Sequence, residues 1–139
     1  MNLAEVIEQF RPAATAFAQG DPDPVKALFS HAEDVTLANP FGPAVRGWDN
    51  VSAALDYASS RFSDGYVSDF NNVASYVGTD LATYLDTERW HSRVGGGELA
   101  EFNLRVTTTF RNEEGDWMIV HRHADPISTP DEAGPLRNQ

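Results

Sequence analysis

Two carboxylates and one guanidinium are the residues of this chain whose types and spacing could support chemistry. Asp86 and Glu88 lie two residues apart in a segment that is long enough for a strand, so in extended backbone their side chains share one face. Arg122 lies in the last such segment. A buried arginine orients a carboxylate through two hydrogen bonds, and a carboxylate left in an apolar pocket has a raised pKa suited to a general base. The simpler alternative is an ion pair between Asp86 and Arg122 that only neutralises two buried charges.

Histidines form a second group of residues that could support chemistry. His121 and His123 share one face of the same segment, with His91 nearby, and such a patch could bind a divalent metal or act as a base. No carboxylate-containing motif accompanies them, so we expect packing roles and no metal site. His31 lies at a predicted helix end, where a cation interacts favourably with the helix dipole.

Apolar periodicity predicts the helices that must position these residues. The first covers the run from Leu3 to Phe17, with a kink at Pro12. A second, short helix has Asp23 as its N-cap and Pro24 at its first position. A third helix is expected around residues 51–62, capped by Asp49 or Asn50 and ended by Asp64-Gly65.

Strands follow in the second half of the chain. A short strand is expected at residues 35–39, followed by a loop at 40–47 with two prolines and two glycines. Short turns then separate four long strands, which predicts an antiparallel meander. The long strands are expected at residues 66–77, 81–94, 99–111 and 117–125. Three helices before an antiparallel sheet indicate the α+β class, and a curled sheet with helices across its mouth encloses a pocket for a small molecule.

Composition excludes several classes of partner. The 139 residues carry a net charge of −11, which argues against nucleic acid and anionic membranes. The absence of cysteine excludes disulfides and thiolate catalysis. The N-terminus does not read as a signal peptide and no apolar run is long enough to span a membrane, so we expect a cytoplasmic protein. Residues 1–125 are expected to form a single domain, and residues 126–139 a polar, flexible tail.

Two segments resemble a known superfamily. Residues 32–42 read A-E-D-V-T-L-A-N-P-F-G, followed by Arg46-Gly47, and residues 115–123 read G-D-W-M-I-V-H-R-H. Both resemble the nuclear transport factor 2-like superfamily, especially its SnoaL-like and ketosteroid-isomerase-like branch. The second segment is also similar to the association domain of calcium/calmodulin-dependent kinase II. Over residues 1–125 the resemblance implies a cone-shaped, curved antiparallel (mixed) sheet with three N-terminal helices around a pocket.

The resemblance also implies which strand faces line the pocket. Even-numbered residues of the last three strands are expected to face inward, and odd-numbered residues to face outward. Superfamily members often dimerise through the outer face, so we expect a homodimer. Its contacts would include Arg105, Thr107, Trp117, His121 and His123.

Steroid-isomerase chemistry is not expected. It needs a carboxylate base after the first strand, and an oxyanion hole made of a tyrosine and a protonated aspartate. By the resemblance these three positions fall on Asn39, near Ala13 and near Val106, none of which can fill its role.

The limonene-epoxide-hydrolase branch implies another site. It holds one water with an acid–Arg–acid set and an asparagine, and its positions fall here on Asn39, Asp86, Glu88 and Arg122, with the charges exchanged. Asp86 or Glu88 would be the base, Arg122 the orienting or oxyanion-stabilising group, and Asn39 a hydrogen-bonding partner for water or substrate. The expected ligand-binding residues are Tyr84, Trp90, Thr108, Tyr57, Phe41 and Val106, although aromatic side chains of this number could equally form ordinary core.

Two functions follow from these residues. The first is a cofactor-free isomerase, dehydratase or hydrolase that acts on a small apolar molecule. The second is a non-catalytic module for ligand binding or dimerisation. Neither needs a cofactor, and fold alone does not decide between them.

Overall fold

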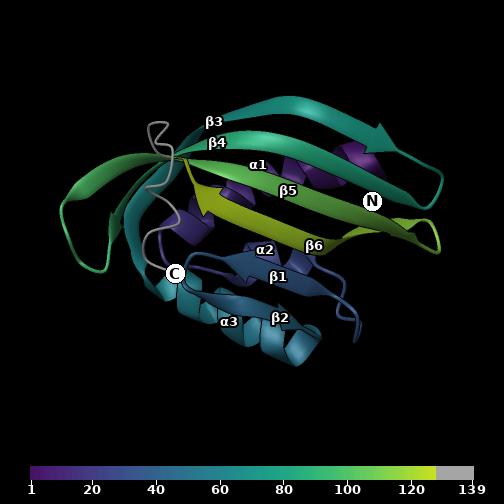
Figure 1. Cartoon of the computed structure of the whole chain (residues 1–139), viewed down its shortest axis with the longest axis horizontal. Coiled ribbons are helices and arrows are strands. Elements are labelled where there is room, and N and C mark those ends of the chain that lie inside the picture. Colours follow the sequence, from purple (N-terminus) through teal and green to yellow (C-terminus); the bar gives the residue numbers. More distant parts are fainter. Residues whose placement is uncertain (128–139) are drawn as a thin grey trace, which may run out of the picture.

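The structure, a computed structural model, describes residues 1–127 as one sheet with helices packed against it (Figure 1). The elements in chain order are α1 (Leu3–Ala18), α2 (Asp23–Leu28), β1 (Thr36–Asn39), β2 (Gly42–Arg46), α3 (Trp48–Ser60), β3 (Phe62–Val77), β4 (Leu81–Val94), β5 (Leu99–Glu113) and β6 (Asp116–Pro126).

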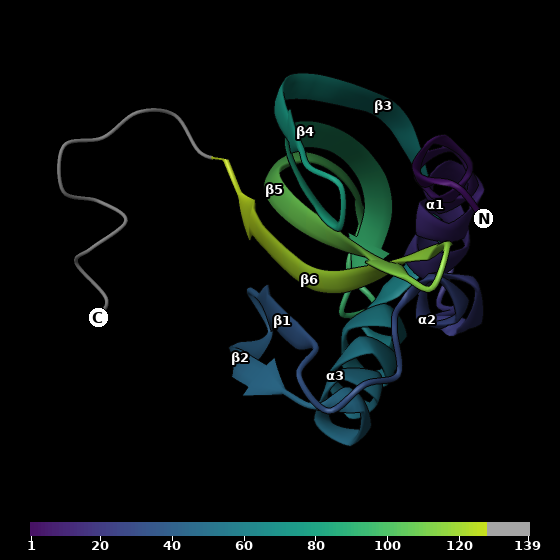
Figure 2. The ribbon, with the colours of Figure 1, turned by 90° about the vertical axis from the view of Figure 1, so that its right-hand side faces the viewer.

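The six strands form a single mixed sheet in the order β2-β1-β6-β5-β4-β3. Strands β3 to β6 are the predicted antiparallel meander, and β1 joins β6 in parallel. Figure 2 shows these long strands curling into an open roll, with α1 and α2 beside it and α3 below. The α+β class, the curved mixed sheet and the three N-terminal helices are therefore confirmed.

Helix α1 is tied to the sheet at its C-terminal end. It begins with a capping box between Asn2 and Glu5, and it runs on through Pro12 as one helix. At its end, the hydroxyl of Ser92 in β4 donates to the carbonyl of Ala18 at 3.1 Å. This fully buried serine gives an orphan helix carbonyl a partner, and α1 is thereby held over the concave face of the sheet.

A bulge in β3 makes this close approach possible. We expected Asp64-Gly65 to end α3, but α3 ends at Ser60 and the pair lies inside β3, between the registered residues Ser63 and Tyr66. A Cβ at Gly65 would lie 2.6 Å from the Ala18 carbonyl oxygen. Only glycine leaves room for α1 at this point, so the glycine marks a contact and not a helix end.

The loop expected at residues 40–47 is also different. It contains β2, which pairs antiparallel with β1 at the edge of the sheet. An edge strand tolerates Pro43 because a proline without an N–H costs nothing on an unpaired side. The expected caps Asp49 and Asn50 are not the N-cap of α3, which is Gly47, and Asn50 donates instead to the carbonyl of Arg46.

Strand parity follows the sequence prediction. The even-numbered residues of β4, β5 and β6 are mostly buried, and the odd-numbered ones other than Ile119 are exposed or half-buried. The buried even-numbered residues are Ala82, Glu88, Trp90, Ser92, Leu104, Val106, Thr108, Phe110, Val120, Arg122 and Ala124. A register shift between Thr109 and Phe110 also turns Ile119 into the core.

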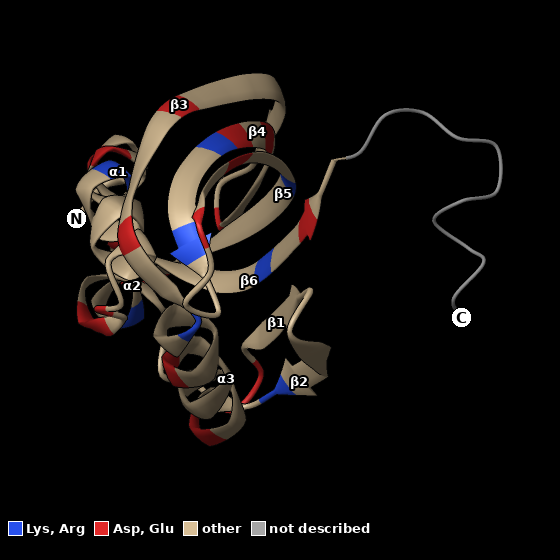
Figure 3. Ribbon diagram, turned by 90° about the vertical axis from the view of Figure 1, so that its left-hand side faces the viewer, with Lys and Arg blue, Asp and Glu red and all other residues tan. Residues whose placement is uncertain are grey.

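Charged residues of both signs are interspersed over helices and strands (Figure 3). Within residues 1–127, no helix is long and apolar enough to cross a membrane. The cytoplasmic location and the absence of a nucleic-acid partner stay predictions. Most of the tail expected at residues 126–139 lies outside the described residues, and Ile127 donates its backbone N–H to Asn103.

Candidate functional site

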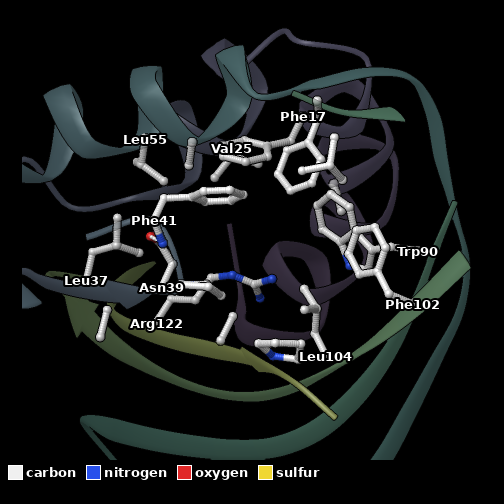
Figure 4. Close-up of a pocket in the computed structure, with 18 of the residues that line it drawn as sticks. Phe17, Val25, Leu37, Asn39, Phe41, Leu55, Trp90, Phe102, Leu104 and Arg122 are labelled. Carbon is white, nitrogen blue, oxygen red and sulfur yellow. Dashed lines mark hydrogen bonds between the residues drawn. The ribbon is translucent and has the colours of Figure 1, made fainter. Parts of the chain in front are cut away.

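The concave face of the sheet and the three helices enclose a main cavity of about 220 Å³. Figure 4 shows aromatic rings on one side and Phe41 with Asn39 on the other, with the Arg122 side chain between them. The lining is almost entirely apolar. It consists of Phe10, Ala14, Phe17, Val25, Leu37, Ala38, Asn39, Pro40, Phe41, Leu55, Ala58, Phe62, Trp90, Val94, Phe102, Leu104, Arg122, Ala124 and Pro126.

Arg122 is the charged residue of this lining, and Glu88 holds it in place. Arg122 Nη1 and Nη2 donate to the two Glu88 carboxylate oxygens at 3.1 and 2.8 Å. Trp90 Nε1 donates to the same carboxylate at 3.0 Å. Glu88 is 2% and Arg122 7% exposed. The pair therefore spans β5 as a bidentate, buried contact, the strong form of an arginine–carboxylate pair.

Glu88 leaves part of the guanidinium unused. An arginine carries further N–H donors beyond the two engaged here, and no other described residue accepts from Arg122. No described side-chain nitrogen is both sealed from solvent and without a partner. Arg122 Nε, which has no acceptor among the described residues, is therefore not sealed from solvent, and Arg122 lines the main cavity.

Asn39 adds the second polar group of the main cavity. Its Oδ1 accepts the backbone N–H of Phe41 at 3.0 Å, which stabilises the turn between β1 and β2. Its amide nitrogen has no acceptor among the described residues. Arg122 and Asn39 thus offer hydrogen-bond donors to whatever fills the main cavity.

A second cavity of about 100 Å³ lies between α1 and strands β3 to β5. Its lining is Ile7, Phe10, Arg11, Phe70, Asn72, Tyr84, Asp86, Glu88, Thr108 and Phe110. Asp86 Oδ1 accepts the Asn72 amide at 2.8 Å. Burial raises the pKa of Asp86 and the charge of Glu88 raises it further, against the lowering effect of the Asn72 hydrogen bond.

Phe10 separates the two cavities because it lines both. Its ring contacts Phe70 edge-on, with centroids 6.3 Å apart, and the Arg122 guanidinium carbon lies 4.8 Å from its centre. The four residues expected to share one site are therefore divided between two. Arg122 and Asn39 line the main cavity, whereas Asp86 and Glu88 line the second.

The expected ion pair has a different partner as well. The simpler alternative was an ion pair between Asp86 and Arg122. In the structure Glu88, and not Asp86, neutralises Arg122. Both carboxylates face inward, and their side chains differ by one methylene. The longer one reaches the guanidinium, and the shorter one hydrogen-bonds to Asn72.

The expected ligand-binding residues are also distributed. Trp90 and Phe41 line the main cavity, and Tyr84 and Thr108 line the second. Tyr57 lines a third hollow of about 180 Å³. This hollow borders β1, β2 and α3.

One expected ligand residue lies outside the cavities, and the sequence interpretation missed several residues that line them. Val106, 1% exposed, lines none of the three cavities described. The sequence interpretation missed Phe10 and Phe17, seven residues apart on one face of α1, because helical spacing does not distinguish a cavity wall from a core. Phe102 extends the even-numbered face of β5 and follows from the same parity.

Histidines of the sheet lie on its outer face and make local contacts. His121 Nδ1 lies 2.8 Å from Thr36 Oγ1, and His123 Nε2 lies 2.8 Å from Asp125 Oδ2. Burial lowers the pKa of His121, and His123 lowers it further. Among residues 1–127, no three metal-binding side chains of the His, Cys, Asp or Glu type converge on one point.

The other two histidines stack on aromatic rings. His91 stacks on Tyr66 with centroids 4.4 Å apart. His31 stacks on Trp48 at 3.8 Å, and its Nε2 lies 3.2 Å from the carbonyl of Lys26 in the last turn of α2. His31 therefore lies at the C-terminal end of α2, as expected.

Comparisons with known proteins agree with this architecture. A family model described as a SnoaL-like domain matches residues 6–129. No curated protein matches the chain. Among solved structures, an NTF2-like superfamily protein from Salmonella enterica is 19% identical, with a TM-score of 0.76, and the match covers 94% of this chain and 92% of that one.

Two further solved structures have names that mention an activity. A candidate dehydratase of the NTF2-like family from Streptomyces avermitilis is 19% identical, with a TM-score of 0.71 and coverage of 91% of this chain and 95% of that one. A ketosteroid isomerase-like protein from Erwinia carotovora atroseptica is 18% identical, with a TM-score of 0.72 and coverage of 91% and 97%. At this identity the likeness concerns the fold.

The burial of the ion pair predicts that removing one partner destabilises the protein. Arg122→Met should lower the free energy of unfolding by about 3–5 kcal/mol, because it leaves Glu88 buried without a partner. The double variant Glu88→Leu/Arg122→Met should lose less than Arg122→Met alone. Urea unfolding of the three proteins measures this. A loss below about 1 kcal/mol for Arg122→Met, typical of an exposed pair, would contradict the burial of the pair.

The raised pKa of Asp86 predicts how the stability of the protein depends on pH. Because its pKa is raised in the folded state, its stabilising contribution is complete below its ordinary pKa of 3.8 and is lost as the pH rises through the raised value. Asp86→Asn should therefore gain stability relative to the unmodified chain between acid and neutral pH. Urea unfolding over a pH series tests this, with Asp69→Asn on an exposed carboxylate of β3 as the control. A difference that does not change with pH would refute it.

Proposed function

The chain belongs to the SnoaL-like domain family, and we propose that it binds a small, mostly apolar molecule bearing one oxygen function in its main cavity. The observation that carries this proposal is the Arg122 guanidinium, buried in an apolar wall with donors to spare. Ligand sites typically combine an apolar lining with a few fixed polar groups that orient the ligand.

The polar groups favour an oxygen acceptor. Arg122 has no acceptor capacity, and Asn39 uses its carbonyl oxygen in its own turn, so both present N–H groups to the cavity. A carbonyl or carboxylate oxygen matches these donors. The positive charge of Arg122 is balanced by Glu88, so both a neutral ketone and an anion are compatible with the site.

Cavity volume limits the size of the ligand. A dry cavity of about 150 Å³ holds one benzene molecule. By that ratio the main cavity takes about nine non-hydrogen atoms. Acetophenone, benzoate and isopropylbenzene all have this size, and they differ in the presence and charge of an oxygen function.

These three probes test the proposal. We expect acetophenone and benzoate to bind about 10-fold or more tightly than isopropylbenzene, since a hydrogen bond to a charged group contributes about 1.5–3 kcal/mol. NMR titration of the protein measures the three affinities. The preference should disappear in Glu88→Leu/Arg122→Met, in which both buried charges are removed together.

The matched control is Arg105→Met, on an exposed residue of the outer face. It should keep the preference for the oxygenated probes. Equal binding of all three probes by the unmodified chain, or an unchanged preference in the double variant, would rule out Arg122 as the ligand anchor.

A second candidate function is cofactor-free isomerisation, dehydration or hydrolysis. The observation in its favour is Asp86, whose raised pKa suits a general base. Arg122 would stabilise a developing oxyanion, and Asn39 would hold substrate or water. Glu88, which already accepts three hydrogen bonds, would orient Arg122. Proton transfer to Asp86 requires a path from the main cavity to the second one, and Phe10 is the residue that lines both.

Hydrogen exchange tests the second candidate. If Asp86 removes a proton next to a bound carbonyl, the chain should accelerate deuterium uptake at the methyl group of acetophenone in heavy water. Asp86→Asn should abolish the acceleration and leave acetophenone binding intact. NMR of the probe measures uptake, and a rate equal to that of buffer alone would exclude this chemistry for this probe.

We also propose that the outer face of the sheet binds a second copy of the chain. Apolar residues of β3 and β4 are exposed on that face, among them Tyr66 at 49%, Tyr76 at 69% and Leu85 at 39%. The expected contact residues vary in exposure: Arg105 and His123 are exposed, Thr107 and His121 are half-buried, and Trp117 packs partly on the core.

Light scattering at micromolar concentration tests the dimer. The mass should be twice the 15.3 kDa of one chain. Leu85→Glu should halve it, because a charge opposite an apolar patch opposes association. The control is Ala53→Glu, at an exposed position of α3 outside that face. A monomeric mass for the unmodified chain would end the proposal.

A further inference from the structure

The second cavity contains acceptor groups that the protein itself does not satisfy. Asp86 Oδ1 is engaged by Asn72, but no donor among the described residues reaches Oδ2. Thr108 is 6% exposed, lines the cavity and has a hydroxyl without a hydrogen-bond partner in the described part of the chain. Since no described side-chain oxygen is both sealed and unpartnered, the Thr108 hydroxyl opens into the cavity.

Asp86 has no ion-pair partner among the described residues, although Arg11 also lines this cavity. Arg122 is balanced by Glu88 at 2.8 Å, and Arg11 lies 3.7 Å from Glu8 on α1. No described cation lies within ion-pair distance of Asp86. A half-buried carboxylate with only a neutral amide as partner favours the arrival of a positive charge.

Aromatic rings complete the lining. Phe10, Phe70, Tyr84 and Phe110 surround the cavity, and two of these rings already contact a cation, Arg122 over Phe10 and Arg11 over Phe70. Aromatic faces attract cations electrostatically, and they also accommodate the alkyl part of an organic ion.

We propose that the second cavity is a binding site for a small alkylammonium group, with its N–H donors on Asp86 and Thr108 and its alkyl part against the aromatic rings. This site goes beyond the proposed function, since it uses neither Arg122 nor the main cavity. A volume of about 100 Å³ corresponds to about four non-hydrogen atoms. Propylammonium has this size, and 1-propanol is its neutral counterpart.

Amide NMR titration of the full chain with propylammonium chloride tests the site, with potassium chloride as the control for ionic strength. We expect saturable shifts centred on Asp86 and Thr108, and binding at least about 10-fold weaker for 1-propanol. Thr108→Val, which removes the hydroxyl at constant shape, should weaken propylammonium several-fold.

Asp86→Asn should remove propylammonium binding, whereas Asp69→Asn should not affect it. Loss of binding in Asp86→Asn cannot come from unfolding if that variant is at least as stable at neutral pH, which urea unfolding checks in the same samples. Binding should also weaken in acid as Asp86 is protonated. The groups that set this titration are Glu88 on β4, Arg122 on β6, Arg11 on α1 and the neutral Asn72 on β3.

Three results would overturn the proposal: no saturable shift at the second cavity, equal binding of 1-propanol, or unchanged binding by Asp86→Asn. The outcome is independent of the main cavity, because Glu88→Leu/Arg122→Met and the acetophenone series report on that site separately.

Discussion

The buried ion pair between Glu88 and Arg122 fixes the polar groups inside this protein, with Arg122 in the lining of the main cavity and Glu88 in that of the second. Placing two charges away from water is costly, and only good geometry and further hydrogen bonds compensate for it. Here the pair is bidentate and Trp90 donates to the same carboxylate. The contact crosses β5, so it also requires β4, β5 and β6 to keep their register. The guanidinium is thereby fixed in an otherwise apolar wall.

The two sides of this pair differ in hydrogen-bonding character. On the main-cavity side, Arg122 and Asn39 present donors within an apolar lining. On the other side, Asp86 and Thr108 present acceptors near aromatic rings. Phe10 separates them from its position on α1, which the buried serine contact at Ala18 holds against the sheet. A few side chains therefore create two different polar environments within a widely shared fold. In such folds function depends on these site residues and not on the fold itself.

Much of the fold could be predicted from local pattern. The alternation of strand faces followed from the two-residue repeat, and the family resemblance, which indicated the inward face, correctly turned Glu88 and Arg122 inward. The strand β2 was missed because its proline and glycine are typical of loops, and Asp64-Gly65 was taken as a helix end because a bulge uses the same residue types. The partner of Arg122 could not be predicted, because Asp86 and Glu88 share a face of β4 and the strand pattern does not say which side chain reaches the guanidinium. The partition by Phe10 depends on how α1 docks, which is a tertiary feature without a local signal.

A crystal structure of the chain with benzoate bound would show whether Arg122 anchors a ligand in the main cavity. We expect the ring to lie in the main cavity, with its carboxylate hydrogen-bonded to the Arg122 donors that Glu88 leaves unused and with the Glu88–Arg122 contact intact. Benzoate bound with its carboxylate turned away from Arg122, or a main cavity left without benzoate at saturating concentration, would contradict it.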